Sequence, residues 1–358
     1  MIPTINPMQS NNLYRLFEPW TFNKTLTIKN RIIMAPMTRC MADDCLVPTQ
    51  DMVDYYARRA DAGLIIAEAT IIRADGQGYP NTPGIYSKSQ IEGWRQVTKK
   101  VHDNGGKIFL QLFHAGRVTH AVYLKGEQPI APSSIALDGT ASRTDGLRYP
   151  IPRSLAIDEI SPLVDSFAQA AKNAIKAGFD GVEIHAANGY IIDQFLHWQS
   201  NHRTDKYGCT SENMTFFALQ VVDAVTNAVG ADRVGIRLSP AAYIHMTHHQ
   251  DDVQVFRHLL PQLDDRNLAY LHTGMFDDSL SFDELGGNVT SFLRKNYNGT
   301  LIASGSYVPQ KAVDAISKNL FDLIAFGRSF IANPDLIHKI KFNQELLTYD
   351  ESMLEELI

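Results

Sequence analysis

Short apolar runs recur along this chain, and each is followed by a stretch with helical periodicity. Apolar runs without polar alternation are typical of strands that are covered on both faces, as parallel strands are. This alternation constrains the fold more than any other feature of the sequence. The eight runs lie at residues 31–36, 63–68, 107–112, 181–184, 234–238, 268–271, 301–303 and 323–326.

Amphipathic stretches lie between the runs, for example at residues 161–177, 211–229 and 309–318. Strands that alternate with helices predict a parallel sheet, and eight such units in about 300 residues predict a closed barrel. We therefore expect an α/β fold, a (β/α)8 TIM barrel with an N-terminal hairpin, as one domain over residues 1–358. Residues 113–158 and 273–299 form long connections after the third and sixth strands, and we expect them to cap the barrel.

Charge and composition exclude several classes of protein. The formal net charge is −6, without the basic stripe of a nucleic-acid-binding protein. No apolar run reaches the length of a membrane span, and Met1 to Ser10 lack the pattern of a secretory signal. Three cysteines without a C-x-x-C pair indicate reduced thiols. We expect a cytoplasmic protein that binds neither nucleic acid nor membrane.

A histidine, an asparagine and a tyrosine follow the fourth predicted strand closely. His185 and Asn188 are three residues apart, so we expect them on one face of a helical turn. Two neutral donors there can bind one oxygen, and the phenol of Tyr190 can deliver a proton. The pattern indicates a site that polarises a carbonyl or nitro group and protonates its neighbour. The alternative is structural: a histidine satisfied by backbone and a tyrosine packed in a turn.

Other polar residues end predicted strands, and the active sites of such barrels lie at the carboxyl ends of the strands. Arg237 lies in the fifth predicted strand, and we expect it to point into the barrel mouth, where a buried cation needs negative charge. That charge is either a neighbouring carboxylate or an electron-rich cofactor that becomes anionic when reduced. Gly305 and Ser306 follow the seventh strand, and Gly327 and Arg328 follow the eighth. Barrels often bind phosphate at this place through backbone amides and a cation.

Six separated segments, taken together and in order, resemble the old yellow enzyme family. The members of this family are FMN-dependent ene-reductases built on a (β/α)8 barrel. The resemblance runs from about Leu16 to Pro334. Residues 76–85 are similar to the branch shared by bacterial xenobiotic reductases and plant oxophytodienoate reductases. The six segments are residues 30–39, 111–117, 178–185, 193–196, 203–208 and 326–328.

The resemblance implies a role for each residue at a matching position. His185 and Asn188 would bind the activating oxygen of the substrate, and Tyr190 would be the proton donor. Arg237 would face N1 and the C2 carbonyl of the flavin, where charge accumulates on reduction. No metal is implied. The remaining cofactor contacts would be Pro36, Thr38, Ala69 and Gln111 to the flavin ring, and Gly305, Ser306, Gly327 and Arg328 to the phosphate.

The activity implied is a ping-pong reduction. NADPH or NADH reduces FMN and leaves, and an activated alkene, an α,β-unsaturated carbonyl or nitro compound, then takes its place. The chain would work as a monomer or homodimer. The alternative is a catalytically weakened, flavin-binding relative with a binding or sensing role. A flavin-free aldolase is disfavoured because no lysine ends a predicted strand.

Some residues depart from the family pattern or suggest other sites. Cys209 stands where the family usually has glycine, and Met214 where it has arginine. Near the C-terminus Met353 and Leu354 replace the aromatic residues of the family, with Tyr349 as a candidate substitute. Histidines 245, 248 and 249, with aspartates 251 and 252, resemble metal ligands, but we interpret them as a solvated loop. We interpret Cys40, just after Thr38, as a structural or incidental thiol.

Overall fold

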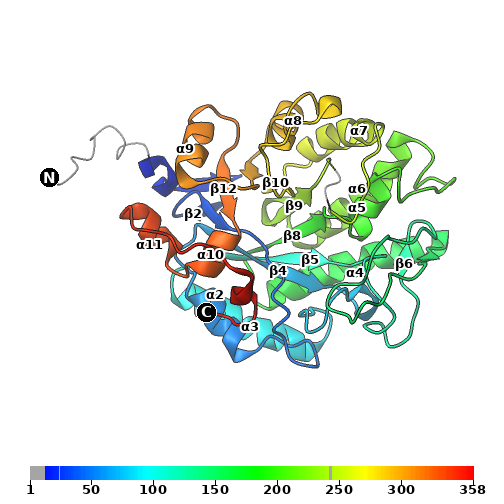
Figure 1. Ribbon diagram of the computed structural model, residues 1–358, viewed down its shortest axis with the longest axis horizontal. Coiled ribbons are helices and arrows are strands. Elements are labelled where there is room, and N and C mark those ends of the chain that lie inside the picture. Colours follow the sequence, from blue (N-terminus) through cyan, green and yellow to red (C-terminus); the bar gives the residue numbers. More distant parts are fainter. Residues whose placement is uncertain (1–12, 24, 242–243) are drawn as a thin grey trace.

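Eight parallel strands close into a barrel, with helices around it (Figure 1). The computed structural model describes residues 13–23, 25–241 and 244–358, so the expectation about Met1 to Ser10 lies outside them. Each predicted run overlaps one strand, and the predicted TIM barrel is confirmed. The strands are β3 (Ile32–Met34), β4 (Leu64–Ile71), β5 (Ile108–Phe113), β8 (Gly181–Ala186), β9 (Val234–Leu238), β10 (Tyr270–Thr273), β11 (Leu301–Ala303) and β12 (Leu323–Phe326).

The helices pack their apolar faces onto the outside of the barrel, where most of the core lies. The three predicted amphipathic stretches correspond to α4, α6 and α9. The helices are α2 (Gln50–Ala57), α3 (Lys88–Asp103), α4 (Ile157–Lys176), α5 (Ile191–Leu196), α6 (Ser211–Val229), α7 (Asp252–Asp264), α8 (Val289–Asn296), α9 (Pro309–Ser317), α10 (Arg328–Ala332) and α11 (Leu336–Lys341). Short 3₁₀ turns are η1 (Leu13–Phe17), η2 (Ala74–Gly76), η3 (Ala231–Arg233), η4 (Asp283–Leu285) and η5 (Glu351–Leu354).

The predicted N-terminal hairpin closes the amino-terminal end of the barrel. It consists of β1 (Trp20–Phe22) and β2 (Leu26–Ile28), which pair in antiparallel fashion. Phe22 is fully buried, and its ring lies 5.8 Å from that of Tyr270 inside the barrel. Burial of aromatic surface of this kind stabilises the barrel floor by excluding water from it.

The barrel interior becomes polar above this apolar floor. Gln111 Nε2 donates to Glu183 Oε1 over 2.7 Å, and His272 Nδ1 donates to Glu183 Oε2 over 2.9 Å. All three side chains are buried. Burial raises the pKa of Glu183, but His272 and Arg237 outweigh it and hold that pKa below its usual value. A charged layer therefore underlies the carboxyl end of the barrel.

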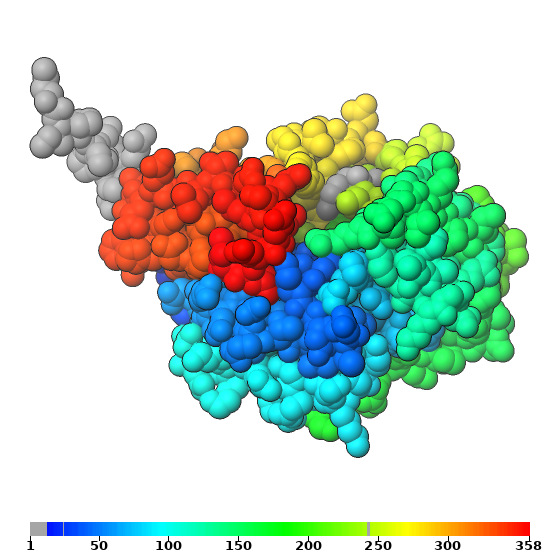
Figure 2. All heavy atoms as spheres, turned by 60° about the horizontal axis from the view of Figure 1, so that its bottom comes forward, coloured from blue at the N-terminus to red at the C-terminus, as the bar shows by residue number. Residues whose placement is uncertain are grey.

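The two long connections differ in structure. The connection after β5 contains a small parallel pair, β6 (Ile130–Ala131) and β7 (Arg153–Ser154). The connection after β10 contains the barrel helix α8, which starts where the Asn288 side chain accepts from Ser291 N. The predicted cap at 273–299 is therefore shorter than expected, because this asparagine begins a helix. Figure 2 shows the loop after β5 (turquoise to green) and the C-terminal segment (red) on one face.

Cys40, Cys45 and Cys209 are all free thiols. Among the described residues, the helices are each too short or too polar to traverse a lipid bilayer.

Candidate active site

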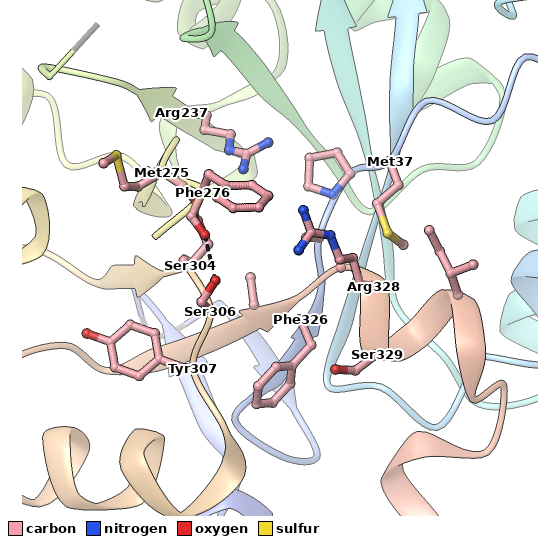
Figure 3. Close-up of a pocket in the computed structure, with 16 residues that line it drawn as sticks. Met37, Arg237, Met275, Phe276, Ser304, Ser306, Tyr307, Phe326, Arg328 and Ser329 are labelled. Carbon is pink, nitrogen blue, oxygen red and sulfur yellow. Dashed lines mark hydrogen bonds between the residues drawn. The ribbon is translucent and has the colours of Figure 1, made fainter. Parts of the chain in front are cut away.

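A cavity of about 370 Å³ lies at the carboxyl ends of β3, β9, β11 and β12 (Figure 3). Its walls combine backbone turns with two arginines, Arg237 and Arg328, which come from different strands. Met37, Met275 and Phe276 supply much of its apolar surface. The cavity lies where the sequence placed the site, at the barrel mouth.

One end of the cavity combines a glycine turn with a cation. Gly305 (φ +114°) and Ser306 (φ +61°) form a left-handed turn after β11. A Cβ at Gly305 would lie 2.6 Å from Asp278 N, so only glycine fits there. The Ser306 hydroxyl donates to Phe276 O over 2.9 Å, the dashed line in Figure 3. Gly327 and Arg328 line the same cavity, so the four residues that the sequence assigns to a phosphate lie together.

Arg328 is held by aromatic rings. Its guanidinium carbon lies 4.2 Å from the ring centroid of Phe276 and 5.7 Å from that of Tyr349. Tyr349 thus brings the C-terminal segment to Arg328 at the edge of the cavity. Stacking orients a guanidinium and leaves its N–H edge available for a phosphate.

Arg237 occupies the other end of the cavity. It is only 8% exposed, and its Nε donates to Thr273 O over 3.3 Å. Among the described residues it forms no ion pair, although Glu183 in the layer below is close enough for Arg237 to lower its pKa. A carboxylate is therefore near, as the first alternative expects, while the guanidinium points into the cavity (Figure 3).

The residues present fit FMN, the cofactor that the resemblance implies. An anion cradle lies at one end of the cavity, and a buried cation suited to an electron-rich ring lies at the other. Pro36 lines the cavity between them. Three predicted ring contacts lie outside this lining: Thr38 is half-buried, Ala69 belongs to an apolar cluster with Phe113 and Tyr190, and Gln111 donates to Glu183.

The histidine, asparagine and tyrosine meet in a way that differs from the prediction. β8 extends to Ala186, so His185 lies on the strand. Asn188 (φ +61°) and Gly189 (φ +78°) form a left-handed turn, and Tyr190 is the N-cap of α5. The prediction that His185 and Asn188 share one face of a helical turn was wrong, because the helix begins only at Ile191. The rings of His185 and Tyr190 nevertheless pack edge to face, with centroids 4.9 Å apart.

His185 is a neutral imidazole in this environment. Burial, and then the charges of Arg237 and His272, place its pKa well below the usual value. Its Nδ1 and the Oδ1 of Asn188 are buried without a hydrogen-bond partner. Buried polar atoms are nearly always paired, so these two indicate a ligand that completes them.

Two residues of this site carry no role in the sequence-based interpretation. The hydroxyls of Tyr79 and Tyr190 lie 2.7 Å apart, and burial raises the pKa of Tyr79. Tyr79 lies in the segment 76–85, and the resemblance of this segment to the family could have indicated that Tyr79 belongs to the site. The His245 ring lies 5.9 Å from that of Tyr190, and its Nδ1 lies 3.2 Å from Asn188 O.

The prediction of a solvated loop around His245 was only partly correct. His248 and His249 are exposed, and His248 pairs with Glu284. His245, by contrast, is half-buried against Tyr190, and Asp252 is fully buried beside His197. These contacts join loops from two successive βα units, and a loop-by-loop interpretation of the sequence does not include them.

The departures at residues 209–214 are accommodated in the fold. Cys209 has φ +70°, a left-handed conformation that glycine adopts more easily. Met214 is fully buried in the core between the helices and the barrel. The backbone oxygen of Met353 accepts from Arg39 Nη2 over 2.8 Å.

Comparison with known proteins gives a consistent result. Residues 15–346 match the model of the NADH:flavin oxidoreductase / NADH oxidase family. A probable flavin mononucleotide-dependent alkene reductase of Leishmania infantum is 41% identical, over 87% of this chain and 86% of the relative. 12-Oxophytodienoate reductase 1 of Oryza sativa subsp. japonica is 40% identical, over 91% and 86%. The structure of the old yellow enzyme homologue from Zymomonas mobilis superposes with a TM-score of 0.89 at 40% identity, covering 95% of this chain and 96% of the other.

Proposed function

Because this chain belongs to the NADH:flavin oxidoreductase / NADH oxidase family, as an old yellow enzyme, we propose that it reduces the C=C bond of activated alkenes. It is an FMN-dependent oxidoreductase that takes its electrons from a nicotinamide nucleotide. The proposed substrates are α,β-unsaturated carbonyl and nitro compounds. The proposed compartment is the cytoplasm, in keeping with the free thiols.

The carrying observation is the unpartnered, buried ring nitrogen of His185 beside Tyr190. His185 Nδ1 has no hydrogen-bond partner among the described residues, and the phenol of Tyr190 packs against the same imidazole. A substrate oxygen that accepts from the His185 ring and from the amide N–H of the Asn188 side chain brings the adjacent carbon towards the Tyr190 hydroxyl. Each component of a polarise-and-protonate site is therefore available at one place.

Bound FMN supplies the hydride for the alkene and receives it from NADH or NADPH. Pro36, Thr38, Ala69 and Gln111 are assigned to its ring, and Gly305, Ser306, Gly327 and Arg328 to its phosphate. Arg237 provides positive charge where reduction adds electrons. Both reactants are proposed to use the same mouth in turn, which makes the kinetics ping-pong.

The remaining chemistry falls to side chains of this protein. Neutral His185 and Asn188 stabilise negative charge on the substrate oxygen, as donors placed in advance do in an oxyanion hole. The Tyr190 hydroxyl gives its proton to the α-carbon. The Tyr79 hydroxyl, 2.7 Å away, then donates to the Tyr190 oxygen and stabilises its negative charge.

A visible spectrum of the purified protein under argon tests this function. We expect flavin bands that bleach with NADH or NADPH and return when 2-cyclohexenone is added. Flavin that bleaches but stays reduced with the enone would remove alkenes as substrates and favour a binding or sensing role. A colourless protein that does not take up FMN would contradict the cofactor assignment.

A further inference from the structure

A buried histidine lies between two carboxylates behind the active site. His197 Nε2 is 3.1 Å from Asp193 Oδ1, and His197 Nδ1 is 2.8 Å from Asp252 Oδ2. All three side chains are fully buried. Asp193 belongs to α5 and Asp252 begins α7, so the group joins two successive βα units. None of the roles assigned so far uses it.

The geometry requires a doubly protonated ring. Each ring nitrogen faces a carboxylate oxygen, which can only accept. Burial lowers the pKa of His197, but Asp193 and then Asp252 outweigh it and raise the pKa to about 10. The apolar Phe256 ring packs at 5.4 Å. At neutral pH His197 is an imidazolium that donates once to each aspartate.

Asp193 also binds the left-handed turn formed by Asn188 and Gly189. Its Oδ2 accepts from Gly189 N over 2.8 Å and from the Ser239 hydroxyl over 3.1 Å. The Ser239 oxygen in turn accepts from Asn188 N over 2.8 Å. Two successive N–H groups of the turn are therefore bound to one chain of hydrogen bonds. The left-handed conformation of Asn188 is uncommon for a residue with a side chain, so these bonds help to stabilise it.

Asp252, on the other side of His197, holds two further backbone groups. It accepts from Trp198 N over 2.9 Å and from His249 N over 3.1 Å. The same loop carries His245, whose ring reaches Asn188 O. The amide of Asn188 is thus held by hydrogen bonds that lead through Ser239 and Asp193 to His197. Its carbonyl is held by His245, from the loop whose His249 amide Asp252 binds.

We propose that His197 is a positioning residue: by bridging Asp193 and Asp252 it sets where the Asn188 side chain and the Tyr190 hydroxyl lie. This inference rests on the proposed function, in which those two groups bind and protonate the alkene. His197 touches neither substrate nor cofactor, and it acts through Asp193 and Ser239. The alternative is a purely structural ion cluster that stabilises the fold without affecting the site.

Three variants of the FMN-loaded enzyme separate these alternatives. His197→Gln removes the charge, and Ser239→Ala removes only the hydroxyl between Asp193 and Asn188. His102→Gln is the control for loss of a histidine–aspartate pair away from the site. His102 Nε2 lies 2.8 Å from Asp180 Oδ2, just before the amino-terminal end of β8, the strand that leads to Asn188. A misplacement of about 1 Å costs on the order of a hundredfold in rate. We therefore expect kcat/KM for 2-cyclohexenone to fall roughly 10- to 100-fold in the first two variants, and not in the control.

Two further readouts do not depend on overall stability. The effects of His197→Gln and Ser239→Ala on kcat/KM are expected to be non-additive in the double variant, because both act through one chain of hydrogen bonds. Nitrogen-15 NMR of labelled histidine should show both ring nitrogens of His197 protonated at pH 7.5. If His197→Gln does not fold, Ser239→Ala and the NMR spectrum of the native enzyme decide.

Additive effects, a neutral His197 ring, or a Ser239→Ala enzyme as active as the control would overturn the proposal. Failure of the proposed function gives a different result, since native enzyme would then not turn over the enone at all. In that case hydrogen exchange at the Asn188 and Gly189 amides still tests whether the hydrogen bonds through Ser239 hold the turn. Exchange in Ser239→Ala that is no faster than in native enzyme would overturn the positioning role.

Discussion

At the scale of single residues, the pairing of Tyr190 with Tyr79 has the most direct chemical consequence. General acids contribute about 10²- to 10⁴-fold to rate. We expect Tyr190→Phe to retain FMN and its reduction by NADH, and to slow oxidation by 2-cyclohexenone by about that factor. Stopped-flow spectroscopy separates the two half-reactions. Enone oxidation at the native rate would remove Tyr190 from the mechanism.

Tyr79→Phe is the milder companion change. It removes the hydrogen bond to the Tyr190 oxygen and keeps the ring. One hydrogen bond contributes about 0.5–1.5 kcal/mol, so we expect enone oxidation to slow about 2- to 13-fold. Flavin reduction at the native rate is the internal control. A loss as large as that of Tyr190→Phe would instead make Tyr79 the proton donor.

The neutral state of His185 predicts a pH profile. A histidine with an ordinary pKa gains a proton as pH falls through about 6.5. Burial, Arg237 and His272 depress the pKa of His185, so it stays neutral through that range. We expect the rate of enone oxidation to show no step near pH 6.5, measured by stopped flow from pH 5.5 to 8. A step that disappears in His185→Asn would contradict the neutral assignment.

At the scale of elements, the cluster that joins α5 to α7 predicts how stability depends on pH. The pKa of His197 is raised from 6.5 to about 10 in the folded state. Its contribution is therefore complete below pH 6.5 and is lost as pH rises towards 10. We expect the free energy of unfolding in urea to be about 3–5 kcal/mol higher for native enzyme than for His197→Gln at pH 6.5. The difference should be smaller at pH 9.5. A difference that grows with pH would contradict this.

The elements themselves could be predicted well from the sequence, because apolar runs and helical periodicity are local signals. The proximity of Gly305 and Arg328 could also be predicted, since they follow strands β11 and β12, which lie side by side in the barrel. The turn at Asn188 could not, because a left-handed asparagine leaves no periodic signal. The positions of His245 and Asp252 depend on contacts between two loops, which form only once the barrel closes.

At the scale of the whole molecule, the cofactor should act as part of the fold. A ligand at 100 times its Kd stabilises the folded state by about 2.7 kcal/mol. We expect the thermal midpoint of the FMN-free protein to rise with added FMN. Arg328→Ala should need about 10- to 150-fold more FMN for the same rise, since a charged hydrogen bond contributes roughly 1.5–3 kcal/mol. Differential scanning fluorimetry measures both, and an unchanged FMN requirement would exclude Arg328 from the phosphate site.

Closure of the barrel also constrains how the chain is made. β3, near the start, pairs with β12, near the end. During synthesis the early strands therefore present two open sheet edges until the last strand leaves the ribosome. Open edges are templates for pairing with other chains, and contacts between distant segments form slowly. The ring that holds the active site rigid in the finished enzyme leaves the nascent chain exposed to aggregation almost to its end.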